Sequence, residues 1–221
     1  WQIGLAKSFY TPLPLPPGTY TVGTGGNFAT IQDAFNKLET DGVAGNVILE
    51  LIDELYTAPT DSFGFKLNGP IPGAGPNSRV TIKPALNENV TIEGNGRYLM
   101  TCINTSYMTV DGVSLSGVTT FTFHANKNAQ YTWNGCLDFV NNSDHNIVQN
   151  INFISDDYYG HGPGPVFETF QGSIAAADSN LIQNNFIKRA GIAIYVGTIP
   201  TLLATGNIVR GNFVGSETDS L

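Results

Sequence analysis

Charged side chains are scarce in this chain of 221 residues, and basic ones are scarcer than acidic ones. Lys and Arg number 10 against 18 Asp and Glu, which gives a formal net charge of -8 at pH 7. Domains that bind nucleic acid through its phosphates are usually basic, so no nucleic-acid partner is predicted. The acidic balance fits a secreted surface. No cofactor is predicted, but the charge is compatible with calcium sites, because carboxylate oxygens are the usual ligands of calcium.

Cysteines and long apolar runs are also scarce. Cys102 and Cys136 stand about one repeat apart, and we expect buried thiols on neighbouring rungs, with a disulfide between the rungs as the alternative. Neither has a Cys or His neighbour at metal-ligand spacing, so no metal site is predicted. No apolar run is long enough to span a bilayer. The chain starts at Trp1 without a leader pattern, and we expect a mature or excised piece of an extracellular or cell-surface protein.

A short phrase recurs along the second half of the chain, at residues 146–153, 180–186 and 207–213, with a weaker copy at 108–115. Each copy has a few aliphatic residues followed by Asn or Gly and another apolar residue. Strand-like content repeated at such a spacing is typical of a solenoid. The positions taken as equivalent are Val110, Val148, Ile182 and Val209.

The sequence divides into an arm and a repeat domain. Residues 1–23 are Pro-rich and are predicted to form an extended arm or linker, or else a tail packed along the body. Residues 24–221 are predicted to be all-β. Their one convincing helix, residues 31–38, has an apolar face, an N-cap at Thr30 and a stop at Gly42. We expect it to cover the open N-terminal end of the solenoid.

Short strands and two irregular segments fill the rest. Residues 116–135 are predicted to be an insertion and 155–172 a long loop, and long loops on a regular fold often carry function. The chain stops directly after a good repeat, so we expect either more of a longer parent protein or a stacked copy to cover that end. Strands are predicted at 47–52, 63–67, 79–82, 89–92, 99–103 and 108–110.

Residues 26–35, 47–51 and 90–94, together with the Asn-rich phrases, resemble right-handed parallel β-helix proteins of the pectate-lyase-like group. That group includes pectin methylesterases and polygalacturonases. Over residues 24–214 the chain looks most like the β-helix modules of large secreted bacterial surface proteins.

The resemblance implies a right-handed parallel β-helix with an N-terminal helical cap and three short parallel sheets as its walls. It also implies ladders of inward Asn side chains at the turns, which satisfy buried amides by hydrogen bonds between rungs. Asn150 and Asn184 are the first candidates for such a ladder, followed by Asn185 and Asn212.

Those enzymes of this fold that act on acidic polysaccharides need particular groups. Hydrolases need carboxylates on both sides of the bond, and lyases need calcium ligands and a base. Lys188 or Arg189 would be the base of a lyase, but their order does not reproduce the basic signature of polygalacturonases. Asp156-Asp157 and the Gly-His161-Gly that follows resemble motifs of that family. In that family these motifs lie on successive coils, whereas here they share one loop. For a lyase, the candidate calcium ligands are Asp138, Asp144, Asp156 and Asp157.

The two histidines before the long loop are assigned no catalytic role. The segment around His145 precedes a strand in the same way as Asp178-Ser-Asn180 does one coil later, which indicates that both segments consist of turn-forming residues. His124 has no such partner in its segment.

Aromatic residues gather in the two irregular segments. Tyr131, Trp133, Tyr158 and Tyr159 would form a sugar-stacking platform if both segments project from one side, or they fold back to cover the solenoid. The sequence thus leads to three functional hypotheses. The first is a structural or adhesive module without an assembled catalytic site, which associates end to end or belongs to a longer chain. The others are a polysaccharide lyase or hydrolase, and a carbohydrate-binding module.

Overall fold

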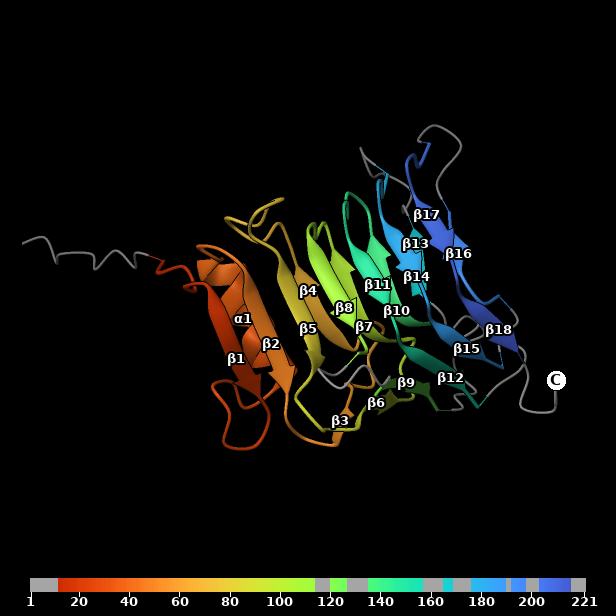
Figure 1. Cartoon of the computed structure of the whole chain (residues 1–221), viewed down its shortest axis with the longest axis horizontal. Helices are drawn as coiled ribbons and strands as arrows, with labels where there is room; N and C mark the ends of the chain where they lie inside the picture. The colour runs from red at the N-terminus through yellow and green to blue at the C-terminus, as the bar shows by residue number, and fades with distance from the viewer. Residues whose placement is uncertain are drawn as a thin grey trace, which may run out of the picture.

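The computed structural model describes residues 12–113, 120–126, 135–156, 165–168, 176–189, 192–197 and 203–215, with the backbone alone for 165–168. These residues form a parallel β-helix whose coils follow one another along the long axis of the molecule (Figure 1). A complete coil contributes one strand to each of three parallel sheets, so strands far apart in sequence become neighbours. The first and last described coils contribute fewer strands. The solenoid prediction is confirmed.

The first sheet has seven strands and the second has six, and within each sheet every pair of neighbours is parallel. The first sheet consists of β1 (Gly18–Val22), β2 (Val47–Leu51), β5 (Val80–Pro84), β8 (Met108–Asp111), β11 (Ile147–Gln149), β14 (Leu181–Gln183) and β17 (Ile208–Arg210). The second consists of β3 (Leu55–Thr57), β6 (Val90–Gly94), β9 (Phe121–Ala125), β12 (Asn152–Ser155), β15 (Phe186–Lys188) and β18 (Phe213–Gly215). The third consists of β4 (Phe65–Asn68), β7 (Tyr98–Ile103), β10 (Gly135–Val140), β13 (Pro165–Glu168) and β16 (Tyr195–Val196).

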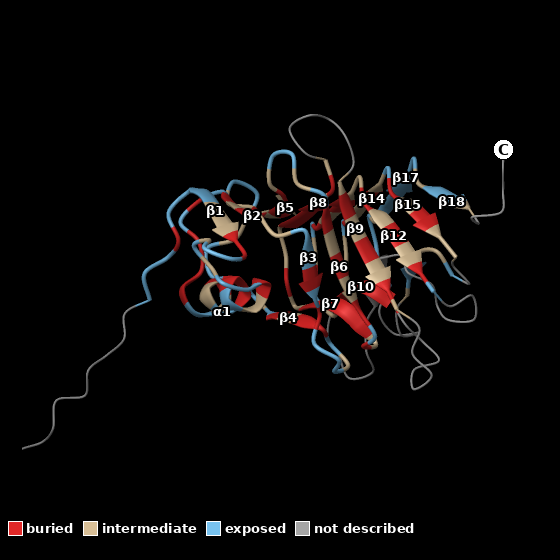
Figure 2. Ribbon diagram, turned by 90° about the horizontal axis from the view of Figure 1, so that it is seen from below, coloured by how far each residue is buried: buried red, intermediate tan, exposed pale blue. Residues whose placement is uncertain are grey.

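The buried residues lie mainly in the strands and on the helix (Figure 2). Apolar residues of successive coils form one continuous core. In the first sheet, Val110, Val148, Ile182 and Val209 are in register, which confirms the repeat alignment drawn from the sequence. In the second sheet a row of aromatic rings faces inward, and Phe123 and Phe153 pack at a centroid distance of 5.5 Å. Alternate residues point outward because successive side chains of a strand leave opposite faces of the sheet.

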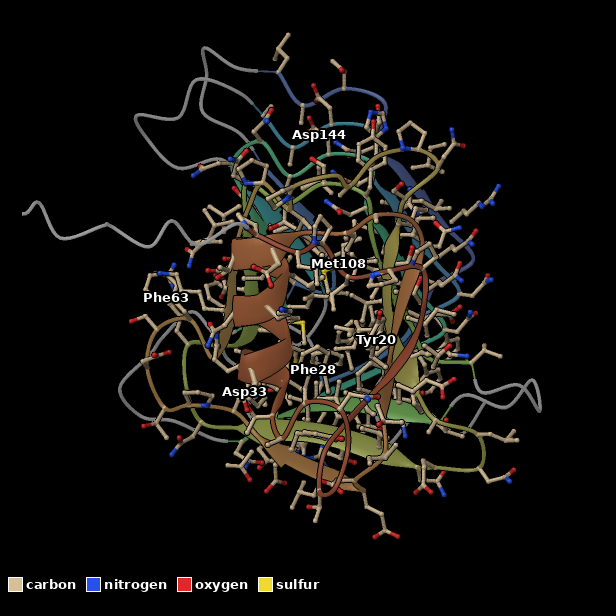
Figure 3. The ribbon with its side chains drawn as sticks, turned by 90° about the vertical axis from the view of Figure 1, so that its left-hand side faces the viewer. Tyr20, Phe28, Asp33, Phe63, Met108 and Asp144 are labelled. Atoms are coloured by element: carbon tan, nitrogen blue, oxygen red, sulfur yellow. The ribbon has the colours of Figure 1, made fainter. Side chains whose placement is uncertain are left out.

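The helix α1 (Ile31–Asp41) stands beside β4, at the N-terminal end of the third wall (Figure 3). The Thr30 hydroxyl accepts a hydrogen bond from the Asp33 amide at 3.0 Å, and Gly42, with φ 73°, ends the helix, so both predicted boundaries are confirmed. Ile31, Ala34, Phe35 and Leu38 are buried in the core. None of the helical residues described forms a segment of the length and apolarity that a membrane crossing requires.

Side chains of α1 cover the outer edge of β4. Gln32 accepts from the Lys66 amide at 2.9 Å and donates to the Lys66 carbonyl at 2.8 Å. Glu39 accepts from the Asn68 amide at 2.6 Å. An unpaired strand edge is a template for association, and these polar side chains take the place of a neighbouring strand. The helix therefore closes an edge of the third sheet.

Three segments differ from the sequence-based expectation. Gly18–Val22, which the sequence assigns to the arm, is the strand β1 and pairs with β2. Its alternation of Tyr20 and Val22 with threonines is the pattern of a strand at the edge of a sheet. Phe121–Ala125, assigned to an insertion, is a regular strand of the second sheet. Pro165–Glu168, assigned to a loop, pairs with β10. The irregular segments therefore interrupt the coils without breaking their register.

The two cysteines are free and buried, as expected of thiols. They do not stack on each other, because Cys102 lies opposite Phe139 and Cys136 lies three residues before that position. Burial raises the pKa of both thiols well above the ordinary value.

Candidate functional site

The corner between the third and first sheets holds a ladder of asparagines, of which the first two are buried and the third is half-buried. Asn146, Asn180 and Asn207 occupy equivalent positions in three successive coils. The Oδ1 of Asn146 accepts from the Met108 amide at 2.9 Å, that of Asn180 from the Asn146 amide at 2.8 Å, and that of Asn207 from the Asn180 amide at 2.9 Å. The intervals are 38, 34 and 27 residues, so loops of different length leave the corner geometry unchanged.

A second ladder lies at the corner between the first and second sheets. Asn185 accepts from the Ile151 amide at 3.1 Å, and Asn212 accepts from the Asn185 amide at 2.9 Å. Both were candidates from the sequence. The first-choice candidates, Asn150 and Asn184, were wrong. They have φ values of 58° and 55°, and each turns the chain just before a ladder position. Asn tolerates this left-handed conformation better than most residues, which explains its presence there.

A polar row runs along the outside of the first sheet. Gln149 donates to Asp111 at 2.8 Å, Gln183 donates to Gln149 at 2.7 Å, and Arg210 donates through Nε to Gln183 at 2.9 Å. Earlier in the same row, Lys83 and Glu50 form an ion pair at 3.2 Å. These side chains bond to neighbouring coils, so they stabilise the stack and are not arranged around a ligand.

Two of the polar candidates, Asp156 and Arg189, meet His124 at the end of the second sheet. We call these three residues the Asp156 cluster. The Nε2 of His124 lies 2.9 Å from Asp156 Oδ1, and the Arg189 guanidinium lies 4.0 Å from the same oxygen. Lys188 is in register with Ile154, which is in register with His124. The side chains of His124 and Asp156 are 31% and 40% exposed.

The sequence analysis assigned no role to His124, although a signal was present. Thr122 and His124 alternate with buried Phe121 and Phe123, which is the pattern of a strand with His124 on its outer face. Once β9 is recognised as a rung, His124 falls beside the residues that follow β12. Asp156 supplies the carboxylate of the cluster, and Glu93 of β6 is the register neighbour of His124 in the same outer row. Glycoside hydrolysis uses a pair of carboxylates that flank the bond.

The other sequence candidates are separated or lie outside the described residues. Asp138 is buried in β10 of the third sheet, and Asp144 lies in the turn before β11, far along the coil from Asp156. No three His, Cys, Asp or Glu side chains of the described segments form a group that could hold a metal ion. The candidates outside the described residues are Asp157, His161, Tyr131, Trp133, Tyr158 and Tyr159.

A recess of about 440 Å³ opens at the corner between the third and first sheets, and we call it the Arg79 recess. Its lining includes Arg79, Tyr107, His145 and Ser179. The rings of Tyr107 and His145 stack at 4.9 Å and 17°, and the guanidinium lies 5.8 Å from the Tyr107 centroid. Both aromatic residues have positive φ, at 62° and 57°. Large side chains are unfavourable in this left-handed backbone conformation, so the stacking contact between the two rings has to offset its energetic cost.

Arg79 is fixed in the recess by three hydrogen bonds. Its Nη2 donates to the carbonyls of His145 at 2.7 Å and Met108 at 3.2 Å, and its Nε donates to the Thr109 hydroxyl at 3.3 Å. Burial lowers the pKa of the Arg79 guanidinium. The side chain still presents a positive charge, because the pKa of arginine starts far above neutrality. The recess can therefore hold a small anion or a ring that packs on aromatic faces.

Asp144 precedes His145, and its carboxylate accepts from the Asp178 amide of the next coil at 2.7 Å. Burial raises the pKa of Asp144, with the nearby negative charge of Asp178 acting in the same direction and the amide hydrogen bond opposing both.

Comparison with known proteins returns no matching protein-family model, curated protein or solved structure for this chain.

Proposed function

We propose that the chain is a structural or adhesive β-helix module of a secreted or cell-surface protein or filament, and that it does not act as a catalyst. One observation carries the proposal: the polar side chains at the corners and along the outside of the first sheet form rows of hydrogen bonds between coils. Such rows join short coils into a stiff rod, and their side chains bond to neighbouring coils.

The Asp156 cluster gives the sharpest test of this proposal, because it is where a catalytic site would be assembled. The chain is incubated with polygalacturonate and calcium, and unsaturated products and reducing ends are measured over time. We expect no product beyond that of a heat-denatured control. Turnover that is lost in Asp156→Asn and in His124→Gln, with both variants still folded, would refute the proposal and establish a lyase or hydrolase.

The Arg79 recess favours a second candidate function, which is binding of an acidic polysaccharide without turnover. A fixed guanidinium beside two stacked rings suits a uronate, whose carboxylate pairs with the cation while its apolar face packs on an aromatic ring. The test is calorimetric titration with oligogalacturonate. We expect binding to be weakened at least about tenfold, or 1.4 kcal/mol, by Tyr107→Gly, a substitution that suits the positive φ.

Phe63→Ala is the matched control, because it removes an exposed ring far from the recess. Equal affinity in the parent chain and in Tyr107→Gly would remove the recess from consideration as a glycan site.

A further inference from the structure

The last described coil, β17 and β18, presents core positions to solvent (Figure 2). Val209 is 49% exposed, whereas Ile182, its partner in the preceding coil, is 1% exposed. Val214 is 55% exposed, and its partner Ile187 is 0% exposed. These valines continue the inward rows of the first two sheets, so their exposure results from the lack of a neighbour on that side among the described residues. We call this surface the C-terminal face.

Both asparagine ladders point away from the C-terminal face. Each ladder side chain bonds backward: Asn207 accepts from the Asn180 amide and donates to the Ala177 carbonyl at 2.8 Å. Asn212 likewise accepts from the Asn185 amide and donates to the Ile182 carbonyl at 3.0 Å. The amide N–H groups of Asn207 and Asn212 consequently receive no acceptor from the described residues. The same N–H of every earlier ladder asparagine is met by an Asn Oδ1 from the following coil.

The outer polar row ends in a cation at this face. Arg210 donates through Nε to Gln183 of the preceding coil, and its Nη groups make no hydrogen bond or ion pair within the described segments. The row already uses opposite charges between neighbouring coils, since Lys83 pairs with Glu50. A carboxylate or amide oxygen in the next rung would continue the row.

We propose that the C-terminal face binds a further in-register coil of a parallel β-solenoid with the sequence pattern Asn-x-apolar-acidic-x-Asn-x-apolar. The two asparagines supply acceptors for the Asn207 and Asn212 amides. The two apolar residues cover Val209 and Val214, and the acidic residue meets Arg210. This inference rests on the proposed structural function, because it names the kind of partner that such a module takes at its C-terminal face. It is a form of strand addition in which side-chain rows provide the specificity.

The N-terminal end of a second copy does not have this pattern. In the rows of Asn207 and Arg210, β1 carries Gly18 and Thr21, which offer neither an amide side chain nor a carboxylate. On the third side, α1 stands in place of a strand. Two C-terminal faces pressed together would both present amide N–H groups and exposed valines, and neither would supply Asn side chains. A copy of this chain is therefore a poor occupant of the face.

The test adds such a coil to the chain itself. A copy of residues 195–215, appended after Leu221, places the copied Asn207 and Asn212 one step of 27 residues after the originals, which is the interval between Asn180 and Asn207. In the copy, the residue corresponding to Arg210 is changed to Glu. Amide hydrogen exchange is measured residue by residue, with β14 amides reporting that the original chain is folded. The matched control carries Ala at the two copied asparagines.

We expect the amides of Asn207 and Asn212 to exchange at least about tenfold more slowly in the extended chain, and to lose most of that protection in the Ala control. Unchanged exchange at these amides while β14 stays protected would overturn the inference, as would equal protection in the Ala control. A parent chain that dimerises through this face in sedimentation velocity would also overturn it. Polysaccharide turnover would contradict only the proposed function, so the two failures are distinguishable.

Discussion

Replacing Asn180 by Ala tests whether the corner ladder holds the coils together. Asn180 is 1% exposed and makes two hydrogen bonds to the preceding coil. Its Oδ1 accepts from the Asn146 amide at 2.8 Å, and its Nδ2 donates to the Ser143 carbonyl at 3.0 Å. Both partners belong to residues that are fully buried, so water does not replace the lost side chain without a rearrangement of the corner.

The expected loss follows from the two groups left unpaired. A buried donor or acceptor without a partner costs about 1–3 kcal/mol, so Asn180→Ala should lower the free energy of unfolding by about 2–6 kcal/mol. Loss of packing at the corner adds to this figure. With a urea slope of about 2–3 kcal/mol per molar, the unfolding midpoint should fall by roughly 1 M or more.

The matched control is Asn184→Gly, four residues further along the same coil. Asn184 is exposed, has φ 55° and lies outside the ladder, and glycine adopts that backbone conformation readily. We expect its unfolding midpoint to lie close to that of the parent chain. Both variants are measured by urea denaturation followed by circular dichroism, with the slopes compared to check that unfolding remains a single transition.

Two outcomes would refute the ladder assignment. One is a loss of less than about 1 kcal/mol in Asn180→Ala, which is below the cost of one unpaired buried group. The other is an equal loss in the two variants, which would mean that the presence of asparagine at either corner matters and its inward position does not.

Three further predictions concern the edge of β4, the pH dependence of stability and the two buried thiols. Gln32→Ala combined with Glu39→Ala uncovers the edge of β4, and we expect the double variant to self-associate more than the parent in sedimentation velocity. The pKa of Asp144 is raised in the folded state, so the folded protein binds the proton more tightly than the unfolded chain, and the contribution of Asp144 to stability falls as the pH rises above about 4. Asp144→Asn should therefore be more stable than the parent chain at pH 7. Urea denaturation should show that this difference in stability becomes smaller toward pH 4. Cys102 and Cys136 should react with a thiol reagent in urea, and should stay unreactive in the native chain when absorbance is followed.

The sequence was enough to predict the solenoid and its helix. The helix carries its own boundary signals in Thr30 and Gly42, and its apolar face is continuous. The repeat alignment was equally accessible, because inward positions must be apolar in every coil, and Val148, Ile182 and Val209 satisfy that requirement at the same place in the phrase. Local signals and periodic burial are both readable from residue type.

The sequence does not show in the same way which of two adjacent asparagines belongs to the ladder. Asn184 and Asn185 are adjacent and chemically identical, yet one turns the chain outward and the other bonds inward. Only the backbone conformation separates them: a residue with positive φ reverses the chain direction, and the following side chain then points into the corner. Asparagine suits both positions, so residue type carries no information about which is which.

The same reasoning explains why the Asp156 cluster was only partly foreseen. Asp156 and Arg189 each follow the last residue of a strand in the second sheet by one position, so stacking in register brings them together without any motif in the local sequence. His124 joins them from a strand that was taken for an insertion, because the segments on either side of β9 hide its period.

In a solenoid, side-chain neighbours are set by position within the coil. An inward position requires an apolar residue or a ladder asparagine, whereas an outward position requires nothing of the kind. The outward rows are therefore where this chain can vary its chemistry, and both the Asp156 cluster and the stacked rings of the Arg79 recess lie on them.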